Sequence, residues 1–302
     1  MDLKGIMKRA QLVAYLEITF SVIVWGASFV ATKVAVKEVS PVTVVWLRFA
    51  IGVVILGLAT VLRGQFAIPV RNDVGYLVLL GFLGITFHQW LQSTGLVTAE
   101  ATTTAWIVAT TPIFMALLGW LVLSERMSWR QGLGILVAIL GVLLVVSKGN
   151  IGALAGGHFG SRGDLLVMIS APNWAVFSIL SRRGLKRYPA TRMMFYVMAF
   201  GWLFTSVLFI YGGGFDQWSK LSLDGWLGVG FLGVFCSGLA YIFWYDGLKA
   251  LPAAQVGAFL YIEPFVTVIV AAIVLKESLL VASLLGGVAI LLGVWIVNRS
   301  GR

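Results

Sequence analysis

The chain has 302 residues, of which 60% are hydrophobic and only 11% are charged. Average soluble proteins carry about 25% charged residues, so this composition excludes an ordinary soluble domain. The single cysteine, Cys236, excludes an internal disulfide framework and a cysteine-built metal site.

Ten apolar runs follow one another along the chain, each about long enough to cross a bilayer as a helix. The first run follows basic residues, but it is too long for the core of a signal peptide, and no small-residue cleavage site follows it. The sequence therefore predicts an all-α integral membrane protein whose spans lie at about 12–34, 43–62, 74–95, 102–123, 131–147, 163–181, 191–211, 225–245, 254–275 and 280–297.

The net charge of +10 is distributed unevenly between the two sets of loops. With a cytoplasmic N-terminus, fifteen Lys and Arg residues lie in inside segments and six lie in outside segments. The positive-inside rule then predicts that both termini are cytoplasmic. The basic excess is an orientation signal, and we expect no nucleic-acid partner.

Two stretches separated by 152 residues match each other in rare residue types. Pro112 matches Pro264 and Glu125 matches Glu277, in a chain with only seven prolines and twelve acidic residues. The same offset relates Gly81 to Gly233, Gly95 to Gly247, Gly134 to Gly286 and Gly141 to Gly293, and offsets of 149 and 148 relate Ser21 to Ser170, Trp25 to Trp174 and Pro41 to Pro189. We interpret the chain as a duplicated five-helix unit.

An odd number of spans per unit determines how the two copies are oriented. If the first span runs outward, the sixth must run inward, so the copies are inverted, as in many secondary transporters. We expect a first repeat at 1–148, an extracytoplasmic glycine-rich linker at 149–162 and a second repeat at 163–302. The linker lacks the spacing of a phosphate-binding loop and is expected to be a flexible connector.

Several short motifs carry a family resemblance over nearly the whole chain. They are Trp25-Gly26-Ala27-Ser28-Phe29 and Lys33 in the first span, Pro41 and Arg48-Phe49 around the second, Pro112 and Pro264 in the fourth and ninth, and Ser124-Glu125-Arg126 and Lys276-Glu277-Ser278 before the fifth and tenth. With five plus five spans, the chain resembles the EamA branch of the drug/metabolite transporter superfamily.

This resemblance implies a transporter, often an exporter of amino acids or other small metabolites. It also implies a central cavity lined by spans 1, 3, 4, 6, 8 and 9. The aromatic content leads us to expect amino acids, including aromatic ones, as substrates. The alternatives are a drug or other metabolite exporter and a uniporter of the same fold. The sequence fits import and export equally, and does not choose between ion coupling and facilitated diffusion.

Prolines inside spans predict bends, because proline removes one backbone hydrogen bond and clashes with the preceding turn. Pro112 and Pro264 are expected to kink their helices, with the hydroxyls of Thr110 and Thr111 available to the freed carbonyl beside Pro112. A hinge role and a purely structural bend both fit. Pro172 predicts a similarly broken centre in the sixth span.

Acidic residues within spans are expensive, so they should face protein or water. Glu263 is the deepest acid, and it can bind a substrate amine, carry a proton or pair with Arg48. Glu125 and Glu277 end apolar runs and are expected to be turn and cap residues.

The candidate substrate cavity combines aromatic and polar residues from the six spans. Aromatic groups should hold an apolar part of the substrate, and polar groups should orient it. The residues are Trp25, Ser28, His88, Gln92, Trp106, Asn173, Trp174, Tyr241, Tyr245, Tyr261 and Glu263.

Other classes of protein find less support. A membrane-embedded enzyme needs convergent catalytic groups, and a channel ideally shows a charged or carbonyl-rich filter; neither pattern is present in the sequence. We expect no enzymatic activity, no metal and no cofactor. The expected partners are the lipid bilayer and a small-molecule substrate, with the protein acting as a monomer.

Overall fold

The computed structural model describes residues 3–123, 127–150, 152 and 159–300. In the first half, the helices are α1 (Leu3–Ala35), α2 (Pro41–Leu62), α3 (Arg71–Gly81), the π-helix η1 (Phe82–Phe87), α4 (His88–Thr98), α5 (Ala101–Val108), α6 (Thr111–Leu123) and α7 (Trp129–Val146).

The second half repeats this order. It contains α9 (Arg162–Leu185), α10 (Ala190–Tyr211), the 3-10 helix η2 (Gly214–Lys220), α11 (Leu223–Phe231), the π-helix η3 (Leu232–Leu239), α12 (Ala240–Ala250), α13 (Ala253–Phe259), the 3-10 helix η4 (Leu260–Ile262), α14 (Glu263–Val270), the π-helix η5 (Ala271–Leu275) and α15 (Val281–Ser300). Within the described residues, ten helical stretches are long and apolar enough to cross a membrane. The predicted all-helical fold is confirmed.

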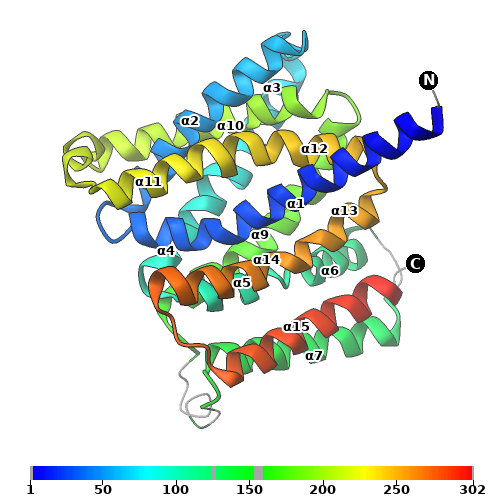
Figure 1. Cartoon of the computed structure of the whole chain (residues 1–302), viewed down its shortest axis with the longest axis vertical. Helices are drawn as coiled ribbons and strands as arrows, with labels where there is room; N and C mark the ends of the chain where they lie inside the picture. Colours follow the sequence, from blue (N-terminus) through cyan, green and yellow to red (C-terminus); the bar gives the residue numbers. More distant parts are fainter. Residues whose placement is uncertain (1–2, 124–126, 151, 153–158, 301–302) are drawn as a thin grey trace.

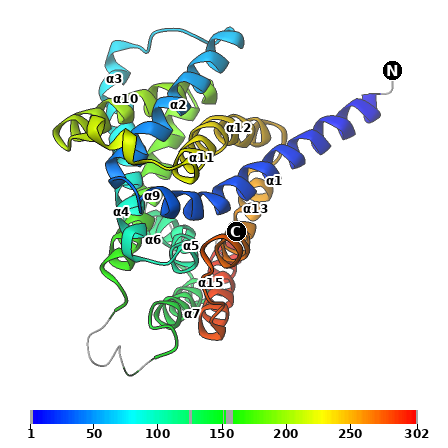
Figure 2. The same ribbon diagram turned by 60° about the vertical axis from the view of Figure 1, so that its left-hand side comes forward.

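Both termini lie on one side of the helix bundle, at the right in Figure 1. We call this the termini side, and the opposite side, where α7 ends and α9 begins, the linker side. Figures 1 and 2 show α7 and α15 side by side at one end of the bundle, while α2 and α10 lie at the other end. The third span begins with α3 beside α10 at this second end, and the other spans lie between the two groups.

The contact between α7 and α15 has the two-fold symmetry expected of inverted repeats. A Cβ atom on Gly134 would lie 2.7 Å from the Gly293 carbonyl oxygen, and one on Gly141 would lie 2.6 Å from the Gly286 carbonyl oxygen. The offset of 152 converts the first pair into the second, so the contact repeats itself. Only glycine permits this backbone approach, which is typical of small residues between membrane helices.

The fourth and ninth spans are interrupted directly before their prolines. One break separates α5 from α6, which begins one residue before Pro112, and the other is η4, which precedes Pro264. Thr111 Oγ1 donates to the Val108 carbonyl at 2.8 Å, and this is the carbonyl that Pro112 leaves without its helical donor. The hydroxyl thus satisfies the carbonyl at the break.

The sixth span differs from our expectation of a broken centre. Pro172 lies inside α9, which is one continuous helix from Arg162 to Leu185. Its neighbours Ala171 and Asn173 are buried, and the Asn173 side-chain amide donates to the Leu83 carbonyl at 2.9 Å. Packing against the adjacent span therefore keeps the helix continuous despite one missing hydrogen bond.

The third and eighth spans each contain a π-helical segment that the sequence did not reveal. The segments are η1 at Phe82–Phe87 and η3 at Leu232–Leu239. The offset of 152 places the first segment within the second, so both repeats carry the same distortion. π-helical turns often occur at functional sites, and residues of the cavity described next follow both of them directly.

Candidate functional site

A cavity of about 1110 Å³ lies between the two halves and is lined by residues from both. It reaches the termini side, where its lining includes Gln131, Arg182, Leu248 and Asn298. On the linker side it ends near Thr32 and Leu96, and it includes no described residue from the linker-side turns. The structure therefore shows a cavity open toward the termini side.

Polar contacts between the helix ends close the linker side. Lys33 Nζ donates to the carbonyls of Leu96, at 3.5 Å, and Ala99. The Glu277 carboxylate accepts from the backbone N–H groups of Ala101 and Thr102 at 2.8 and 3.1 Å. Glu277 is thus a helix cap, as its position in the sequence suggested, although it caps α5 rather than its own span.

Aromatic side chains form one wall of the cavity. Trp25 contacts the rings of Tyr241 and Trp244, with centroid separations of 5.7 and 5.2 Å, and its indole N–H donates to the Cys236 carbonyl at 3.1 Å. That carbonyl lies in a π-helical segment, whose distortion places an acceptor beside the indole. The wall is therefore held by both packing and a hydrogen bond.

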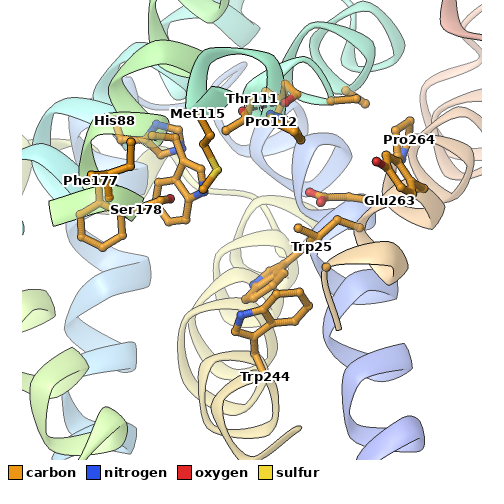
Figure 3. A pocket seen from close by; sticks show the side chains of 18 of the residues that line it. Trp25, His88, Thr111, Pro112, Met115, Phe177, Ser178, Trp244, Glu263 and Pro264 are labelled. Carbon is orange, nitrogen blue, oxygen red and sulfur yellow. Dashed lines mark hydrogen bonds between the residues drawn. The ribbon is translucent and has the colours of Figure 1, made fainter. Parts of the chain in front are cut away.

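A second aromatic group lies across the cavity from Glu263, as Figure 3 shows. The ring centroids of His88 and Trp174 are 4.6 Å apart, and those of Trp174 and Phe177 are 4.8 Å apart. His88 Nδ1 is buried without a hydrogen-bond partner among the described residues. The His88 side chain nevertheless belongs to the cavity lining.

Arg48 brings a buried positive charge to the cavity lining. It is 5% exposed, and its guanidinium donates to Ser237 Oγ and to Gln89 Oε1, both at 3.1 Å. It also lies over the Phe49 ring at 4.9 Å. These partners are neutral, so within the described residues no acidic group compensates the charge.

Glu263 brings a carboxyl group to the opposite part of the lining. Thr267 Oγ1 donates to the carbonyls of Glu263 and Gly26, at 3.1 and 2.8 Å, which fixes the start of α14 against α1. The Glu263 carboxylate points into the space between Trp25 and Pro112 (Figure 3). Among the described residues it has no hydrogen-bond or ion-pair partner, and the pair with Arg48 that the sequence allowed is not formed.

Nine of the eleven residues predicted from the sequence line this one cavity. They are Trp25, Ser28, His88, Gln92, Trp174, Tyr241, Tyr245, Tyr261 and Glu263, and Pro112 and Pro264 lie beside them. Tyr261 is near the mouth, where its hydroxyl accepts a hydrogen bond from Asn298 at 2.7 Å.

The structure places Trp106 and Asn173 outside the lining. Trp106 is fully buried, packs edge to face on Phe265 with centroids 5.6 Å apart, and lies against Gly287 of α15. The Asn173 side-chain amide donates a hydrogen bond to the Leu83 carbonyl of the adjacent span. Glu125, which was expected to be a turn residue, lies outside the described residues.

Several lining residues were not predicted, although the repeat contained a signal for some of them. Phe177 and Ser178 correspond to Ser28 and Phe29 at the offset of 149, and Trp244 corresponds to Gln92 at the offset of 152. Applying the offset to the predicted residues Ser28 and Gln92 would have found Phe177 and Trp244. Met115 lines the cavity too, and no pattern in the sequence marks it.

The chain is similar to known membrane transporters over nearly its whole length. Residues 12–147 and 161–299 each match the EamA-like transporter family. An uncharacterized transporter of Archaeoglobus fulgidus is 26% identical over 287 residues, covering 94% of this chain and 96% of the relative. A "probable terminal-alkyne amino-acid exporter" of Streptantibioticus cattleyicolor is 27% identical over 285 residues, covering 93% and 92%.

A solved crystal structure supports the same fold. It covers 98% of this chain and 98% of its own, with a TM-score of 0.63 and 20% sequence identity. Two family matches, one per half, agree with the two inverted five-helix repeats seen in the structure. The chain is a transporter that belongs to the EamA-like transporter family within the drug/metabolite transporter superfamily.

Proposed function

We propose that this transporter exports amino acids, aromatic ones included, across the plasma (bacterial inner) membrane by alternating access around the central cavity. The observation that carries the proposal is that one acidic and one basic side chain line the same aromatic cavity. Glu263 and Arg48 both line the cavity, and neither is paired with an oppositely charged residue among those described. An amino acid carries both complementary charges at neutral pH.

The cavity offers a matching group for each part of such a substrate. The Glu263 carboxylate receives the ammonium group, and the Arg48 guanidinium donates to the carboxylate, as charge-assisted hydrogen bonds favour. The walls around Trp25 and around Trp174 hold the side chain. The exporter name of the Streptantibioticus relative also points to amino acids.

We propose export as the direction of transport, and the open side of the cavity and the charge distribution support this choice. The positive-inside rule places the termini side in the cytoplasm, so the open cavity takes its substrate from there. Movement to the opposite side requires the closed linker side to open and the termini side to close. We propose a carrier and assign it no enzymatic step.

Counterflow in proteoliposomes tests this function. Vesicles loaded with unlabelled phenylalanine should transiently accumulate external radiolabelled phenylalanine and leucine, because a carrier exchanges them and a channel does not. N-acetylphenylalanine, which keeps the ring and lacks the ammonium group, should fail to compete. The amino-acid assignment is refuted if neither phenylalanine nor leucine shows counterflow in vesicles that contain folded protein.

A further inference from the structure

The two halves can be compared residue by residue, because equivalent positions make equivalent close contacts in both. A Cβ atom on Gly95 would contact Val167, and one on Gly247 would contact Ile18. The offset of 152 relates the two glycines and the offset of 149 relates the two aliphatic residues. The third span therefore meets the sixth in the same way as the eighth meets the first.

This equivalence extends to the cavity faces of α1 and α9. At the offset of 149, four pairs of equivalent residues all line the cavity, and they are Trp25 with Trp174, Ser28 with Phe177, Phe29 with Ser178, and Thr32 with Ser181. Each helix therefore turns the same face inward.

The next pair, Lys33 and Arg182, is where the two halves differ. Lys33 lies outside the cavity lining, and its ammonium group donates to the carbonyls of Leu96 and Ala99 on the closed linker side. Arg182 is exposed, lines the cavity at its open end, and has no hydrogen-bond or ion-pair partner among the described residues. One cation thus lies on the closed linker side, and its equivalent lies at the open end of the cavity.

The acceptors of Lys33 also have equivalents on the termini side. The offset of 152 converts Leu96 into Leu248 and Ala99 into Leu251. Ala99 and Leu251 both end their helices in an extended conformation, with ψ of 152° and 153°, and each N–H donates to the glycine carbonyl four residues earlier. Carbonyls at a helix end lack helical donors and attract cations, so both turns present the same acceptor site.

We propose that Arg182 is the termini-side gate residue of this transporter. In the state whose cavity opens to the linker side, its guanidinium donates to the carbonyls of Leu248 and Leu251 and closes the termini side. Lys33 performs the equivalent task in the present state. The proposal rests on the alternating access proposed above, because the two sets of contacts are formed in turn.

Accessibility of a reporter cysteine tests this role without any substrate. The reporter is Ser28→Cys, on the cavity face of α1, in a Cys236→Ser background. A membrane-impermeant maleimide is applied to intact cells and to inside-out vesicles, and a C-terminal tag identifies the termini side by its protease sensitivity. The ratio of linker-side to termini-side labelling rates measures the balance between the two states.

The expected changes have opposite signs for the two cations. Arg182→Ala should lower the ratio roughly three- to tenfold, the range that one net hydrogen bond supplies, and Lys33→Ala should raise it by a similar factor. Arg182→Lys keeps a donor and should remain close to the parent. The matched controls are Arg183→Ala and Lys37→Ala, which remove neighbouring exposed cations that do not line the cavity.

Two results overturn the proposal, and they differ in what else they refute. If Arg182→Ala labels like Arg183→Ala, or shifts labelling toward the linker side, the gate is wrong while alternating access stands. If the reporter is labelled from one side only in the parent and in every variant, including Lys33→Ala, both the gate and alternating access fail. Amino-acid specificity is not involved in either result.

Discussion

Replacing Glu263 with glutamine tests the charge that we assign to substrate binding. The substitution keeps the size of the side chain and removes its ability to carry a negative charge. The carboxylate has no protein partner among the described residues, so the change leaves no donor unpaired in the substrate-free protein. Its effect should therefore appear on binding rather than on folding.

The size of the effect follows from the interaction that is lost. A hydrogen bond to a charged group contributes about 1.5–3 kcal/mol when its partner is otherwise satisfied. Since about 1.4 kcal/mol corresponds to a tenfold change in Kd, Glu263→Gln should weaken phenylalanine binding roughly 10- to 100-fold. The cavity is open to water on the termini side, which favours the lower end of that range.

A cycle that changes both protein and ligand isolates the proposed contact. Kd is measured by equilibrium binding in detergent for phenylalanine and for 3-phenylpropionate, which lacks the ammonium group. Glu263→Gln should weaken the binding of phenylalanine and leave the Kd for 3-phenylpropionate nearly unchanged. Glu17→Gln is the matched control, because Glu17 lies in α1 outside the cavity lining. Equal losses for both ligands, or a parental Kd for phenylalanine, would refute the assignment.

Three further predictions concern topology, bending and packing. In a cysteine-free background, a cysteine placed within 184–190 should resist an impermeant reagent applied to intact cells, since the basic loop is expected to be cytoplasmic; labelling from outside would reverse the topology. Pro112→Ala and Pro264→Ala should lower the counterflow rate more than they weaken binding, because each restores a backbone donor and stiffens the break. Pro172→Ala, in a continuous helix outside the lining, is their control, and unchanged turnover in both variants leaves only a structural bend. Trp106→Ala should lower the free energy of unfolding in detergent by about 3 kcal/mol, because the tryptophan is fully buried. The Kd for substrate should change little. If the variant binds substrate more weakly and keeps the parental stability, Trp106 contacts the substrate and this prediction is wrong.

The spans were predictable because hydropathy reports the cost of placing a segment in lipid. The expected span at 43–62 is Pro41–Leu62 in the structure, and the one at 191–211 is Ala190–Tyr211. The eighth span is longer than expected, because its last turn carries Asp246, which pairs with Lys249 and with Arg63 at the helix ends. The π-helical segments were not predictable, since a change from α to π geometry leaves the hydropathy unaltered.

The site was predictable to the extent that helical spacing and the repeat define a face. His88 and Gln92 are one turn apart and both line the cavity. Trp106 had equally good spacing, but Gly287 of α15 leaves a space that only a close neighbour can fill, and the indole fills it. Which face of a span turns inward depends on the partner helix, and a single span contains no information about its partner.

The separation of scaffold and site follows from comparing the two copies position by position. Glycines and prolines recur at the same offset, and they form the close contacts and the breaks that both halves need. The charged residue does not recur, since Glu263 corresponds to Thr111, although both line the cavity. A similar scaffold in both halves favours similar energies for the two states, which a carrier requires if neither state is to trap it. A charge in only one copy gives the cavity a direction, so a ligand with an ammonium group keeps one orientation while the access side changes.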